Sequence, residues 1–132
     1  PLDDSEETRQ KVNWVLKIAK GFDAEVLICK ISKSVGDETK NRLEVYAQQI
    51  ETILNREGIR NYSIESYGQN VAEACIKMAQ AEQCDLISIM TETESSNSFF
   101  MGTYAQQLVS TSTIPVMSIH ARNLGKQGAT SY

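Results

Sequence analysis

The segment from Thr91 to Thr103 combines residue types that bear most directly on ligand chemistry. Gly102-Thr103 stands where a helical pattern begins, and the free amides at a helix N-terminus attract an anion through their N–H groups and the helix dipole. The residues before Gly102, back to Thr91, include no glycine and carry Glu92 and Glu94. Carboxylates repel phosphate, and side chains at the bends of a loop keep its amides away from phosphate oxygens. The pattern offers an anion site at Gly102 but argues against a bound triphosphate.

Residues for catalysis or metal binding are sparse. His120 is the single histidine, and neither a nucleophile motif nor a second ligand adjoins it. The three cysteines, Cys29, Cys75 and Cys84, are odd in number and have no metal-ligand spacing, so we interpret them as reduced thiols among core hydrophobes. We therefore expect a protein that is not an enzyme and holds no metal.

Composition narrows the class further. The 132 residues are 41% hydrophobic and 23% charged, with a net charge of −4, which fits one domain with one core. The basic residues form no stripe with interleaved aromatics, which argues against nucleic-acid binding. The longest apolar run is too short for a membrane span, and the first residues do not resemble a signal peptide. We expect a cytoplasmic protein without a membrane partner.

Apolar periodicity predicts the elements that position these residues. Helical spacing alternates with short apolar runs along the whole chain. Gly21 is expected to end the first helix in a left-handed turn, and Gly58 is expected to stop the second helix. Asn70 and Glu73 have the spacing of a capping box. Strict alternation predicts an α/β domain with parallel strands and helices on both faces. The expected helices are Asp4–Gly21, Glu38–Glu57, Asn70–Ala79 and Gly102–Ser110, and the expected strands are Ala24–Ile31, Tyr62–Ser66, Asp85–Met90 and Ile114–Ile119.

The beginning of the sequence lacks an expected element. Asp3-Asp4 is typical of the turn that follows a strand, yet no strand precedes it. We expect that the intact protein supplies a first strand before Pro1. The alternative is that Leu2 begins a frayed terminus.

Four segments in order resemble the universal stress protein family: Pro1–Glu7, Cys84–Met90, Met101–Thr103 and Ile114–Ile119. The resemblance implies a doubly wound, parallel five-stranded sheet of order 3-2-1-4-5, whose central first strand is absent from this segment. It places the domain at residues 1–120 and leaves residues 121–132 as a polar tail that we expect to be mobile. The strand ending in Met-Thr and the run from Phe100 to Gln107 also resemble the second domain of tandem members.

The same resemblance implies where a nucleotide would lie. In members that bind ATP, the ligand crosses the carboxyl ends of the first and fourth strands. Here Gly102-Thr103 matches the family motif, but Thr91 replaces the glycine expected after Met90 and the loop is shorter than the family's spacing. We therefore expect a degenerate site and no cofactor. The alternative is an ATP-binding member with weak or no hydrolysis. The family-equivalent positions are Pro1, Asp3, Met90, Thr91, Gly102, Thr103 and Tyr104.

The expected function is that of a non-catalytic regulatory or interaction module in the stress response. Ile114–Ile119 would form a sheet edge, and an apolar edge strand tends to pair with another chain. We expect it to pair with a second copy or with the other half of a tandem protein. A phospho-accepting receiver domain is rejected, because Ser66-Tyr67-Gly68 offers no acceptor aspartate and the lysine expected after the last strand is absent.

Overall fold

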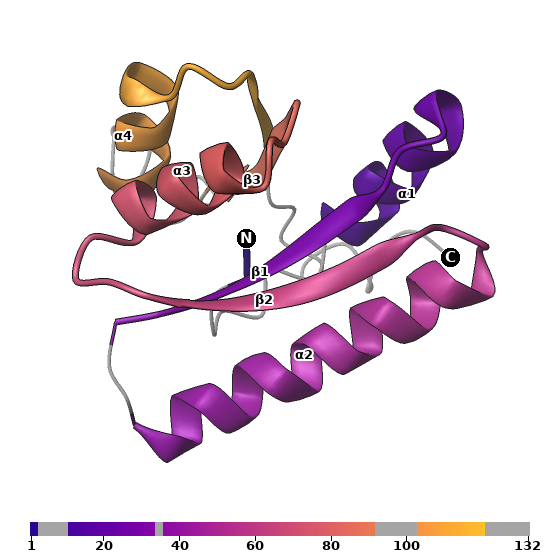
Figure 1. Ribbon diagram of the computed structural model, residues 1–132, viewed down its shortest axis with the longest axis horizontal. Helices are drawn as coiled ribbons and strands as arrows, with labels where there is room; N and C mark the ends of the chain where they lie inside the picture. Colours follow the sequence, from indigo (N-terminus) through magenta and orange to yellow (C-terminus); the bar gives the residue numbers. More distant parts are fainter. Residues whose placement is uncertain (3–10, 34–35, 92–102, 121–132) are drawn as a thin grey trace, which may run out of the picture.

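The computed structural model describes residues 1–2, 11–33, 36–91 and 103–120. Within them, helices alternate with strands as the apolar periodicity predicts (Figure 1). The predicted first turn of the first helix and the predicted tail, residues 121–132, lie outside the described part. No helix in that part has the length and apolar content to span a membrane. The elements are α1 (Val12–Phe22), β1 (Val26–Ser32), α2 (Asp37–Arg56), β2 (Asn61–Tyr67), α3 (Val71–Ala81), β3 (Ile87–Thr91), α4 (Thr103–Thr111) and β4 (Val116–His120).

The predicted order places two strands on each side of a central strand, and the strands on each side do pair in parallel. β1 pairs with β2, and β3 pairs with β4. The expected single five-stranded sheet is not formed by the described residues, which make two separate two-stranded sheets. Leu2 alone bridges Lys30 of β1 in parallel. Its N–H donates to the Cys29 carbonyl at 2.7 Å, and its carbonyl accepts from the Ile31 N–H at 3.3 Å.

Two apolar clusters form the core on opposite faces of β1. Because side chains alternate along a strand, Ile28 joins one cluster while Cys29 and Ile31 join the other. The first cluster holds Leu2 and residues of α1 and α2. The second contains residues of α3 and α4 with both β1 and β3, so α3 and α4 form a layer across the two sheets. Figure 1 shows α2 and α3 on opposite sides of β1 and β2.

Helix ends follow local chemistry, with one correction. The Asn70 side-chain oxygen accepts from the Glu73 N–H at 3.1 Å, which confirms the Asn70 half of the predicted capping box. The Glu73 carboxylate pairs with Lys77. Gly58, with a φ of 71°, follows α2 as expected. Gly21 does not end α1, because the helix continues to Phe22 and Asp23 takes the left-handed conformation with a φ of 51°. A short polar side chain tolerates that conformation, so a glycine was not needed there.

Candidate functional site

The described part of the predicted site lies at the carboxyl ends of β3 and β4. Thr91 is the last residue of β3, and His120, the last of β4, is its partner in the register. The Thr91 Oγ1 donates to the Ile119 carbonyl at 3.3 Å and lies 3.2 Å from His120 Nδ1. The side chain at the position where the resemblance calls for glycine therefore ties β3 to β4.

The other predicted positions are only partly brought together. Met90 is half-buried on β3, and Pro1 is half-buried next to Leu2. The Lys11 ammonium donates to the Pro1 carbonyl, which fixes this segment beside α1. Tyr104 packs against the core from α4, as an ordinary packing residue does. Asp3, Gly102, the Thr103 side chain and the two loop glutamates lie outside what the structure describes.

A large apolar cavity separates the two sheets. Its volume is about 740 Å³, within the range of small-molecule pockets. Residues of α1, β1, α3 and β3 line it, among them Leu2, Val15, Leu27, Cys29, Met78 and Ser88. The Ser88 hydroxyl is buried and has no hydrogen-bond partner among the described residues. Sequence reasoning did not name this cavity.

Cysteines near this cavity are not activated. Burial raises the pKa of the Cys29 thiol to about 11. Burial, followed by the negative charges of Glu82 and Asp85, also raises the pKa of Cys84. Since the thiolate is the nucleophile, both thiols stay largely protonated at neutral pH and are weak nucleophiles. Among the described residues, no group of histidines, cysteines and acids is arranged to hold a metal ion.

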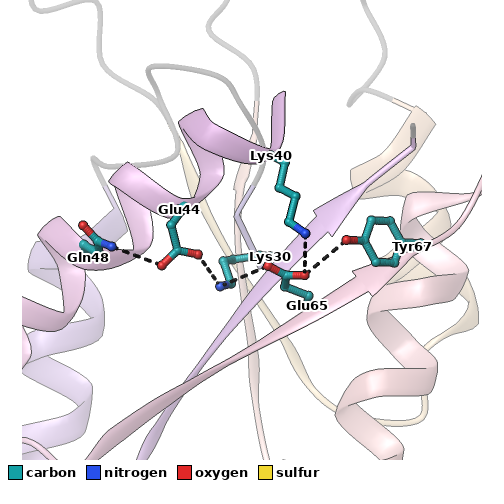
Figure 2. Close-up of polar contacts among 6 residues, drawn as sticks. All are labelled: Lys30, Lys40, Glu44, Gln48, Glu65 and Tyr67. Carbon is teal, nitrogen blue, oxygen red and sulfur yellow. Dashed lines mark hydrogen bonds and ion pairs between the residues drawn. The ribbon is translucent and has the colours of Figure 1, made fainter. Parts of the chain in front are cut away.

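A polar cluster that sequence reasoning missed lies where α2 covers β1 and β2 (Figure 2). At its centre is Lys30, whose side chain is only 10% exposed. Its ammonium lies 2.7 Å from Glu44 Oε2 and 3.6 Å from Glu65 Oε1. The signal was a lysine inside an otherwise apolar strand. The remaining members, Lys40, Gln48 and Tyr67, contact the two carboxylates.

The pKa shifts in this cluster favour the charged forms of Lys30 and Glu44. Burial acts against the charge of Lys30, but the hydrogen bond and charges of Glu44 and Glu65 outweigh it and raise the pKa of the lysine. The hydrogen bond from Lys30 lowers the pKa of Glu44. A lysine that stays protonated is not a nucleophile, so the cluster links α2 to the sheet and is not a reactive centre.

Comparison with known proteins gives one family and several related folds. The model of the Universal stress protein family matches residues 1–120. A universal stress protein from Archaeoglobus fulgidus superposes with a TM-score of 0.76 at 14% identity, over 90% of this chain and 93% of that one. A universal stress protein in complex with cAMP gives 0.73 at 14% identity, over 92% and 93%. An Arabidopsis thaliana family member with AMP bound gives 0.66 at 14% identity, over 89% and 80%. A search of curated proteins gives no significant match.

Proposed function

Since the chain belongs to the universal stress protein family, we propose that it acts as a non-catalytic regulatory or interaction module whose ATP-binding loop is degenerate. The proposal has three parts: the loop does not hold a triphosphate, the chain carries out no reaction, and β4 pairs with a second domain. Each part has its own support.

The observation that carries the first part is the position of Thr91. Thr91 ends β3 at the position where the family's phosphate-binding loop has a glycine and a bare backbone, and its hydroxyl contacts Ile119 and His120 of β4. The sequence continues with Glu92 and Glu94. One carboxylate held about 4 Å from a phosphate charge costs roughly 4 kcal/mol at an effective dielectric constant of about 20, before screening by salt. Geometry and charge therefore both disfavour ATP here.

A non-catalytic role is supported by how the candidate reactive groups are held. Cys29 is a buried thiol with a raised pKa, and Lys30 is held by two carboxylates. Thr91 has a neighbouring histidine nitrogen, but the threonine hydroxyl also donates to a backbone carbonyl of β4. Lys30 and Thr91 are therefore held by partners within the fold, and Cys29 is held by burial.

The third part concerns the outer edge of β4. The Ile87 N–H donates to the Pro115 carbonyl, and hydrogen-bonding direction alternates along a strand. The backbone groups of Val116, Ser118 and His120 therefore face away from β3. Among the described residues no strand covers that edge. We propose that it pairs with β4 of a second copy or with the other half of a tandem protein.

Sedimentation over a range of concentrations tests the pairing. We expect a dimer that Ser118→Pro weakens, because proline removes an outward N–H without removing a bond to β3. Ser118→Ala is the matched control and should dimerise normally. A wild-type chain that stays monomeric at high concentration, or a dimer unaffected by Ser118→Pro, would contradict the pairing.

Adenine-nucleotide binding is the second candidate, favoured by the similar folds solved with cAMP and with AMP. Calorimetric titration with MgATP, AMP and cAMP separates the two. We expect no heat from MgATP at ligand concentrations up to about 1 mM, a weak-binding limit of roughly −4 kcal/mol. Micromolar binding that Gly102→Val abolishes would favour the second candidate instead.

A further inference from the structure

We draw no further inference here: the strongest candidate, the outer edge of β2, where the backbone groups of Ser63 and Glu65 face away from β1, carries nothing because nothing in the part of the chain that the structure describes shows what covers it.

Discussion

Replacing Glu44 and Glu65 together by glutamine should destabilise the protein by about 2 kcal/mol, whereas Lys30→Met should change its stability by less than about 1 kcal/mol. The double change leaves the Lys30 ammonium, whose side chain is 10% exposed, without a counter-charge. The methionine variant removes the charge itself and keeps the apolar stem. The two variants therefore separate the cost of an unpaired buried charge from the net value of the pair.

The magnitude follows from burial. Removing one partner of a fully buried ion pair costs about 3–5 kcal/mol. Here the side chains of Glu44 and Glu65 are 45% and 37% exposed, so water screens them and hydrates part of the lysine once they are neutral. We therefore reduce the figure to about 2 kcal/mol, of which Glu44→Gln alone, the closer contact at 2.7 Å, should account for about 1 kcal/mol.

Urea unfolding followed by circular dichroism measures these changes. With a slope of about 2 kcal/mol per molar urea, the double variant should lose about 1 M in its midpoint. Lys77→Gln is the control, because it removes one member of an exposed pair on α3 and should leave the midpoint unchanged. A loss in Lys30→Met as large as that in the double variant would refute the reasoning, since it would mean that the pair itself is strongly stabilising.

Three further predictions concern pH, backbone conformation and thiol reactivity. The pKa of Glu44 is lowered in the folded protein, so its contribution to the free energy of unfolding is present above its unfolded pKa and is lost as pH falls through the folded pKa. Glu44→Gln should therefore flatten the dependence of stability on pH below about pH 5, and urea titrations that show the same loss of stability at acid pH in both proteins would contradict this. Gly58→Ala should destabilise the protein by about 1 kcal/mol, because the φ of Gly58 is +71°. Gly21→Ala lies inside α1 with free space around the added carbon and should stabilise the protein by about 0.5–1 kcal/mol. Urea midpoints equal to that of the unchanged protein would count against both predictions. Burial raises the Cys29 pKa to about 11, so at pH 8 a thiol reagent should modify the half-buried Cys84 before Cys29. The two cysteines should react at equal rates only after unfolding, and tryptic maps that show faster modification of Cys29 in the folded protein would contradict the prediction.

Local patterns explain why much of the fold was predictable. The alternation of helices and strands depends on apolar spacing, which each segment carries in its own residues. The cap at Asn70 depends on a neighbour three residues away. Gly21 failed as a helix end because Asp23 accepts the left-handed conformation instead. The spacing of apolar residues does not report such a competition between neighbours.

The site was less predictable because its contacts are distant in the sequence. The predicted strand ended at Met90, and the structure extends it by one residue to Thr91. Its hydrogen bond to Ile119, however, depends on the register of β3 against β4, which no local pattern sets. The same holds for Lys30, whose partner Glu44 becomes a neighbour only when α2 lies across β1. The predictions for Asp3 and Gly102 stay predictions.

The proposed pairing through β4 can be read at a single amide. The Ser118 N–H faces away from β3, because the Ile87 N–H donates to the Pro115 carbonyl and hydrogen-bonding direction alternates along a strand. Amide protection at Ser118 that rises with protein concentration identifies pairing through β4. Protection at Ser118 that stays constant over the same range would contradict that pairing.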